Sequence, residues 1–410
     1  TLATLPADAW EAVSGRLFNG AGPGGGGAAG PEVSGYLPAQ IALRAQSLQT
    51  GARQFNRVVV GASQGEGVWR ANVEAEQFGG YVEYRPARAG GATAAGRIYA
   101  RLARLSLPKS DVAQVETLLD QQQPSSVPSL DIVIDDFELR GKKLGRVEVD
   151  AVNRVTGEGR EAVREWRLNR LALVMPEAQL VGSGQWAEVG GTFMTAPGAA
   201  ATARRRAVLD FKLDVADAGA LLERLGTGKA VRGGKGQLTG QVAWLGSPLA
   251  LDYPTLSGNV AVAIEAGQFL KAEPGAARLL SVLSLQSLPR RLVLDFRDVF
   301  QEGFAFDALT GDLKIAQGVA STNNLRMRGV QAAVLMEGQA DIARETQDLR
   351  VIVVPEINAG TASLAYAAIN PAVGLGTFLA QVFLRRPLTA AGTREFHVSG
   401  SWEDPKVEKI

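Results

Sequence analysis

Cysteine is absent from the 410-residue chain, and histidine occurs once, as His397. Without cysteine there are no disulfides and no thiol nucleophile. A structural zinc site needs four ligands that are mostly Cys or His, which argues against a zinc centre. A calcium loop needs a glutamate at a fixed spacing, and Asp131, Asp135 and Asp136 have none at that position. We therefore expect no metal site and no cofactor.

An excess of charge of one sign is also lacking. The chain has 43 Lys and Arg against 42 Asp and Glu, a formal net charge of +1. Binding nucleic acid without sequence preference requires a strongly positive surface, so no nucleic-acid partner is expected. The hydrophobic fraction of 46% and the 48 glycines are typical of a folded chain rich in turns.

What the chain does have is alternation with a period of two residues. From Trp69 to Glu76 the odd positions are apolar and the even positions are polar or small, and the pattern recurs around Val147, Phe211 and Val262. Successive side chains of a strand point to opposite faces of its sheet, so one face would be apolar and the other wet. The sequence therefore predicts a mainly β fold, an antiparallel β meander.

Two places should interrupt the strands. We expect Gly79 and Gly80 to form a turn between one strand that ends near Glu76 and a second that begins at Tyr81. At Asp135 and Asp136 the apolar positions change parity, which predicts a turn or a β-bulge there.

Helical patterns are few. We expect short helices over residues 111–123, 217–226, 276–288 and 361–386. The last lies within the uncharged run 357–384, which is long enough to cross a bilayer but contains Asn358, Asn370 and Pro371. A helical hairpin, packed on the sheet or lying at a membrane interface, fits this run better than a membrane span.

Motifs for catalysis lack their required context. Residues 61–65 match the G-x-S-x-G pattern of serine hydrolases, with Ser63 as the nucleophile. That motif must lead into a helix, whereas an alternating strand follows here. His397, the one available base, has nothing nearby in the sequence to orient it. We therefore expect no catalytic residues.

The predicted sheet presents a packing problem, because a few short helices cannot cover the apolar face of so many strands. The face must pack on a second sheet, close on itself as a barrel, or bind something apolar. Charged residues at 403–409 and only six Tyr and six Trp argue against a closed outer-membrane barrel. Glycine-rich segments at 19–30 and 190–206 interrupt the pattern, and we predict segments of 1–205 and 206–410.

The sequence also resembles a known family. The segment SGNV at 257–260, the stretch from GQFLKAEPGAARLL to GFAFD at 267–307 and the final FHVSGSWEDPKVEKI at 396–410 resemble the C-terminal part of the large, YhdP-type members of the AsmA-like family, which is related to TamB. The resemblance is continuous from about residue 209 to the end and less distinctive before it.

This resemblance implies a function. Such proteins are non-enzymatic carriers that move phospholipids between the inner and outer membranes of Gram-negative bacteria, through the periplasm. Their long β-sheet curls into an open apolar groove that shields the acyl chains. This chain would be the end near the outer membrane, and an inner-membrane anchor would precede it in a longer protein. The same resemblance leaves open envelope protein partners.

The resemblance also assigns roles to residues. Acyl chains would lie along inward-facing apolar positions, and a helical segment near the end would contact the membrane or cap the groove. The groove candidates are Trp69, Val73, Ile132, Ile134, Val147, Val149, Phe211, Leu213, Val262, Ile264, Leu294, Phe296, Phe304 and Phe306. The cap-helix or membrane-contact candidates are Leu375, Phe378, Leu379, Val382, Phe383, Arg385 and Arg386.

One alternative fits the same sequence. A non-enzymatic assembly or scaffold factor of the outer membrane would also be rich in strands, but it would bind protein partners and no lipid. Its apolar face would then be closed protein core.

Overall fold

The computed structural model describes residues 2–6, 39–50, 53–87, 96–108, 127–156, 163–188, 205–226, 231–270, 304–329, 332–355, 393–402 and 404–410. The chain forms two compact units, Thr1–Leu173 and Val174–Ile410, here called unit 1 and unit 2. The segments predicted from the sequence, 1–205 and 206–410, stay a prediction about how the chain is organised.

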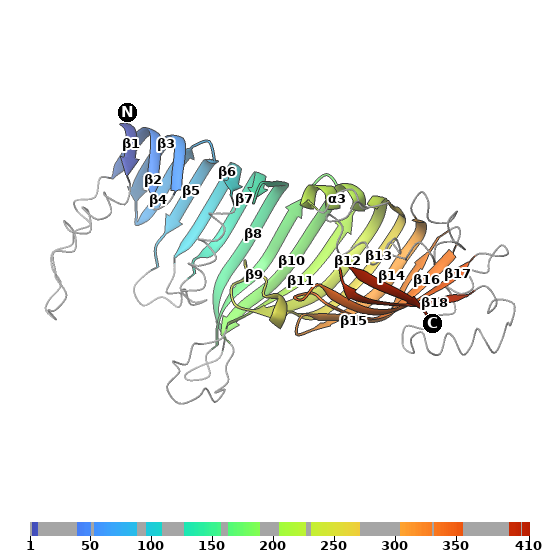
Figure 1. Ribbon diagram of the computed structural model, residues 1–410. Coiled ribbons are helices and arrows are strands. Elements are labelled where there is room, and N and C mark those ends of the chain that lie inside the picture. Colours follow the sequence, from blue (N-terminus) through green and yellow to red (C-terminus); the bar gives the residue numbers. More distant parts are fainter. Residues whose placement is uncertain are drawn as a thin grey trace. The chain divides into compact units, whose positions relative to one another are not determined.

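Unit 1 consists of strands in its described part, and those whose pairing is resolved lie beside their neighbours in the chain (Figure 1). Neighbouring strands pair antiparallel except at two places, where β1 runs parallel to β2 and β6 runs parallel to β7. The strands are β1 Leu2–Pro6, β2 Gln40–Thr50, β3 Arg53–Gly65, β4 Val68–Glu74, β5 Phe78–Arg85, β6 Arg97–Leu107, β7 Ser129–Leu139, β8 Lys142–Thr156 and β9 Val163–Val174.

Unit 2 is an antiparallel sheet in which every strand pairs with the next along the chain, from β10 to β19. The predicted fold class, a long and open antiparallel sheet, is confirmed, with the two parallel pairs of unit 1 as exceptions. The elements are β10 Ala178–Glu188, β11 Arg205–Val215, α3 Ala218–Leu225, β12 Val231–Leu245, η4 Tyr253–Thr255, β13 Ser257–Phe269, β14 Phe304–Ala316, β15 Val319–Arg328, β16 Ala332–Asp341, β17 Thr346–Pro355, β18 Arg394–Ser401 and β19 Pro405–Lys409.

The turn predicted at Gly79 and Gly80 is wrong, because both glycines lie inside β5. The chain turns at Glu76 and Gln77 instead, where the Ala75 N–H donates to the carbonyl of Phe78 at 2.7 Å. Gly80 has a φ of 143° and lies so close to β6 that a Cβ atom there would be 2.3 Å from the carbonyl oxygen of Arg101. Glycine is needed for this close approach between strands rather than for a turn.

The irregularity predicted at Asp135 and Asp136 is confirmed as a β-bulge. Ile134 pairs with Val147 and Phe137 pairs with Gly145, so two residues of β7 lie opposite Arg146 of β8. A bulge of this kind restores the parity of the strand, and Ile134 and Phe137 both stay on the apolar side.

The helix predicted at 217–226 is present as α3. The Asp217 side chain accepts a hydrogen bond from the Ala220 N–H at 2.9 Å, and Gly226 ends the helix in the left-handed conformation with a φ of 87°. Two hydrogen bonds, of 2.8 and 2.6 Å, run from the Arg224 guanidinium to the Glu177 carboxylate just before β10. They attach the helix to the sheet.

The other predicted helices, at 111–123, 276–288 and 361–386, lie outside the described residues, as does the uncharged run 357–384. Within the described ranges, no helix combines the length and the apolar character needed to span a bilayer.

Replacing Gly80 with alanine tests the close approach of β5 and β6. We expect Gly80→Ala to lower the free energy of unfolding by about 2–3 kcal/mol, because the Cβ atom would be forced into the β6 backbone at a φ that favours glycine. Gly61→Ala in β3 is the matched control, since no atom lies within 4 Å of its Cβ position. Urea denaturation should show that Gly61→Ala changes stability by no more than about 0.5 kcal/mol; equal losses would contradict the prediction.

The Glu177–Arg224 pair predicts a dependence of stability on pH. The Arg224 hydrogen bonds hold the pKa of Glu177 below its ordinary value, despite the opposing effect of burial. A lowered pKa contributes stability above the unfolded pKa, near 4.3, and that stability is lost as the pH falls through the folded pKa. Glu177→Gln should therefore cost about 1 kcal/mol at pH 7 and progressively less below about pH 4. Chemical denaturation across this pH range measures it, with exposed Glu188→Gln as control. A constant loss at every pH would refute the assignment.

Candidate apolar binding face

Unit 2 has one face made of apolar residues from successive strands. Strand register places Leu180, Leu213, Leu238 and Val262 directly opposite one another across β10 to β13. A second such row runs Gly182, Phe211, Gly240, Val260 and Leu313. Because these rows sit two residues apart on every strand, they lie on the same side of the sheet.

The centre of this face is half-exposed although it carries no charged side chain. We name these residues the apolar strip: Leu180, Leu209, Phe211, Leu213, Leu238, Val242, Val260, Val262 and Leu313. Core side chains of this kind are normally fully buried. The strip therefore offers apolar surface that the described residues cover only in part.

Buried residues border the apolar strip on two sides. On one side Trp186 and Trp244 are 1% and 6% exposed, and their indole N–H groups donate to the carbonyls of Gly246 and Ser247, each at 2.8 Å. On the other side the buried residues Val215, Ile264 and Leu309 form the next row. The helix α3 packs beside this border. A Cβ atom built on Gly234, two residues along β12 from the residue paired with Ile264, would lie 3.1 Å from the Ala218 side chain of α3. The strip thus runs across the strands between two packed borders.

The opposite face of unit 2 is polar. Asp210, Lys212 and Asp214 alternate with the apolar residues of β11 and are exposed, and Asp210 accepts a hydrogen bond from Gln241 at 2.7 Å. A depression of about 560 Å³ on this face is lined largely by hydroxyl, amide and charged side chains, such as Thr239, Asn259 and Lys314. Charged and amide groups line this depression, whereas the centre of the other face carries no charged side chain, so we assign an apolar ligand to the other face.

Unit 1 repeats the separation of faces. Ile132 pairs with Val149 and Ile134 pairs with Val147, while Val73 lies opposite Gly80. Trp69 joins the same side of the sheet through the row Trp69, Tyr84, Ile98 and Leu130. All six groove candidates of unit 1 therefore share one face.

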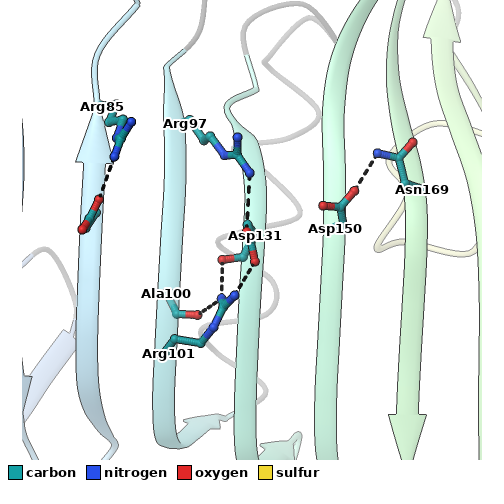
Figure 2. A network of polar contacts seen from close by, with 8 residues as sticks. Arg85, Arg97, Ala100, Arg101, Asp131, Asp150 and Asn169 are labelled. Carbon is teal, nitrogen blue, oxygen red and sulfur yellow. Dashed lines mark hydrogen bonds and ion pairs between the residues drawn. The ribbon is translucent and has the colours of Figure 1, made fainter.

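Ion pairs gather on the other face of unit 1, as Figure 2 shows. Arg101 of β6 donates to the Asp131 carboxylate at 2.8 Å and to the Asp131 carbonyl at 3.0 Å, and Arg97 approaches the same carboxylate at 3.4 Å. Farther along the sheet, Asn169 donates to Asp150 at 2.6 Å. These contacts join neighbouring strands and keep charge away from the apolar face.

Tyr81 and Glu83 belong to the same polar face. The Tyr81 hydroxyl donates to the Glu83 carboxylate at 2.6 Å. This hydrogen bond raises the pKa of Tyr81 and lowers the pKa of Glu83, and Arg85 adds to the lowering. Both groups thus keep their ordinary charge at neutral pH, and neither is prepared for proton transfer.

The structure brings four of the predicted groove residues of unit 2 together: Phe211, Leu213, Val262 and Ile264 share the apolar face. Phe306 is buried, at 4% exposed, and packs on Gly267 and on the Phe269 ring, whose centroid is 5.2 Å away. Its role in a groove stays a prediction.

Other predicted positions lie outside the described part. They are Leu294, Phe296, the side chain of Phe304, and the cap-helix candidates Leu375, Phe378, Leu379, Val382, Phe383, Arg385 and Arg386. Sequence reasoning named three residues of the apolar strip as groove candidates and missed the other six: Leu180, Leu209, Leu238, Val242, Val260 and Leu313. For Leu180 and Leu238 the alternation is interrupted by glycines, and the signal that could have found them is the register opposite Leu213.

The motifs considered for chemistry have no catalytic geometry. Ser63 lies within β3, and the chain continues through a turn at Glu66 and Gly67 into β4, so the strand-to-helix elbow of a serine hydrolase is not formed. His397 has its Nε2 atom 2.7 Å from the Asp348 carboxylate on the neighbouring strand, an ordinary cross-strand pair. Among the described residues no group of acidic or histidine side chains could hold a metal ion.

Comparison with known proteins identifies the family. The family model described as "YhdP protein" matches residues 1–407. The chain belongs to the YhdP family. It is 27% identical over 271 residues to the "Intermembrane phospholipid transporter YhdP" of Escherichia coli (strain K12). That alignment covers 66% of this chain and 20% of the relative, so the chain spans about a fifth of the relative's length. No solved structure matches the chain.

Two valines on the apolar face of unit 2 test whether the strip is open. Val351 of β17 is 0% exposed, whereas Val262 of the strip is half-exposed. We expect Val351→Ala to cost about 2 kcal/mol of unfolding free energy and Val262→Ala less than about 1, because less surface is removed from water at Val262. Urea denaturation of the two variants measures the difference. Equal losses would mean that the strip is closed core in solution.

Proposed function

We propose that this chain is part of a carrier that moves phospholipids between the inner and outer membranes of a Gram-negative bacterium, through the periplasm. The observation that carries the proposal is the half-exposed apolar strip on a sheet whose other face is polar. Membership of the YhdP family supports it, as does the printed name of the relative from Escherichia coli, an intermembrane phospholipid transporter.

The physical basis is the separation of the two faces. Acyl chains lying on the strip leave water at a gain of about 0.8 kcal/mol per buried CH₂ group. The charged headgroup stays in water and avoids the cost of desolvation. The lipid can then move along the face without any covalent step, and the carrier needs no catalytic residues and no cofactor.

The ends of the path are part of the proposal. The chain lies near the outer membrane, and a preceding part of the longer protein holds the inner-membrane anchor. The segment 361–386, which the sequence predicts to be helical, contacts the outer membrane or caps the end of the lipid path through Leu375, Phe378, Leu379, Val382 and Phe383, with Arg385 and Arg386 at the headgroup level.

Site-specific photo-crosslinking in Gram-negative cells tests the carrier function. A photoreactive amino acid replaces Phe211 or Val262 on the apolar strip in the full-length protein. Their sequence neighbours Lys212 and Ala261, exposed on the polar face, serve as matched controls. We expect phospholipid adducts, identified by mass spectrometry, at the strip positions and none above background at the controls.

Other results would point elsewhere. Equal labelling of both faces would show that lipid contact is not directed by the apolar strip. Protein adducts without lipid would favour the alternative function, a scaffold or assembly factor of the outer membrane. Either result would overturn the lipid-carrier proposal.

A further inference from the structure

The apolar face of unit 2 changes character at β16. Strand register continues one row of the face from Leu325 through Met336 and Val351 to Phe396. Leu325 is half-exposed, as the strip residues are, whereas Met336, Val351 and Phe396 are 1%, 0% and 2% exposed. The face itself continues, but its access to solvent ends between β15 and β16.

The other face is closed at the same place. Ala333, Leu335, Ile352 and Val354 occupy the positions where β11 carries charged residues, and all are at most 2% exposed. The sequences of residues 332–336 and 351–354 are apolar without alternation, a pattern typical of strands that are buried on both faces. The adjoining ends of β16 and β17 therefore form a two-sided core.

The dimensions of the open part suit one lipid. The six strands β10 to β15 span about 24 Å, because neighbouring strands lie about 4.8 Å apart. A single acyl chain reaches about 15 Å, half of the bilayer's hydrocarbon core of about 30 Å. From Leu209 to Leu213 the strip is about 13 Å wide at about 3.3 Å per residue. Two hydrocarbon chains at van der Waals separations of about 4 Å fit side by side, whereas the four chains of two lipids would need about 16 Å. Two lipids end to end would need about 30 Å, which exceeds the span of about 24 Å.

We propose that the apolar strip of unit 2 is a bounded seat for the two acyl chains of one phospholipid. The chains lie across β10 to β15, between the Trp186–Trp244 border and the Val215–Ile264–Leu309 row. They stop at β16, where both faces are closed. This inference rests on the proposed carrier function and adds an end point and a stoichiometry to it.

A photoreactive phospholipid maps the seat without altering the protein. The purified chain is incubated with phosphatidylethanolamine vesicles that contain a phospholipid with a diazirine in one acyl chain. After irradiation, peptide mass spectrometry locates the adducts. We expect them on the apolar strip of β11 to β13, and none above background on Met336, Val351 or Phe396. Adducts of comparable yield on these three residues would overturn the end point.

A charge placed in the middle of the strip tests the stoichiometry. We expect Leu238→Lys to remove one bound lipid per chain in native mass spectrometry and to abolish the adducts on β11 to β13. The control is Thr239→Lys, because Thr239 is the next residue and lies on the opposite face. This variant should keep the bound lipid and the adducts on β11 to β13. Circular dichroism checks that each variant is folded. Loss of more than one lipid, or of none, would overturn the single seat.

Failure of the carrier function itself looks different. In that case the wild-type chain would carry no lipid adduct anywhere, and the crosslinks at Phe211 and Val262 in cells would also be missing. Adducts that extend past β16, by contrast, would leave the carrier function standing and remove only the end point.

Discussion

The constraint on which the structure depends is the alternation of side chains in a β-strand. Every second residue faces the same side, so the sequence around Phe211 and Lys212 produces one apolar and one charged face. Repeated over successive paired strands, this gives a sheet whose polar face is stable in contact with water and whose apolar face is not. The apolar side must be covered, and within unit 2 the described residues cover its borders more fully than its centre.

Irregular positions preserve the alternation. In β15, Asn323 and Asn324 both lie opposite Glu337, and the bulge keeps Thr322 and Leu325 on the same side. Asn324 is 7% exposed, accepts from the Asp312 N–H and donates to the Asp312 carboxylate, each at 2.8 Å. The bulge therefore leaves the polar atoms of this buried side chain with partners, which makes it compatible with the sheet.

Much of this was predictable, because alternation is a local property of the sequence. The strands, the bulge at Asp135 and Asp136, and the caps of α3 at Asp217 and Gly226 follow from neighbouring residues. The role of Gly80 does not, because it depends on which backbone lies across the sheet. The parallel pairing of β6 and β7 is likewise a matter of tertiary topology that the alternation of either strand leaves unspecified.

The polar face explains how a single layer can remain open. Exposed ion pairs such as Arg97–Asp131 contribute little free energy each, roughly 0–1 kcal/mol. Because this face is solvated by water, it needs no second layer of protein. Only the apolar face has to be covered by other side chains or by a ligand. On the apolar side, Trp186 and α3 cover the two borders of the strip, and the strip between them stays in partial contact with water. A ligand that covers the strip binds the folded sheet and has no equivalent site on the unfolded chain, so its binding and the stability of unit 2 are thermodynamically linked.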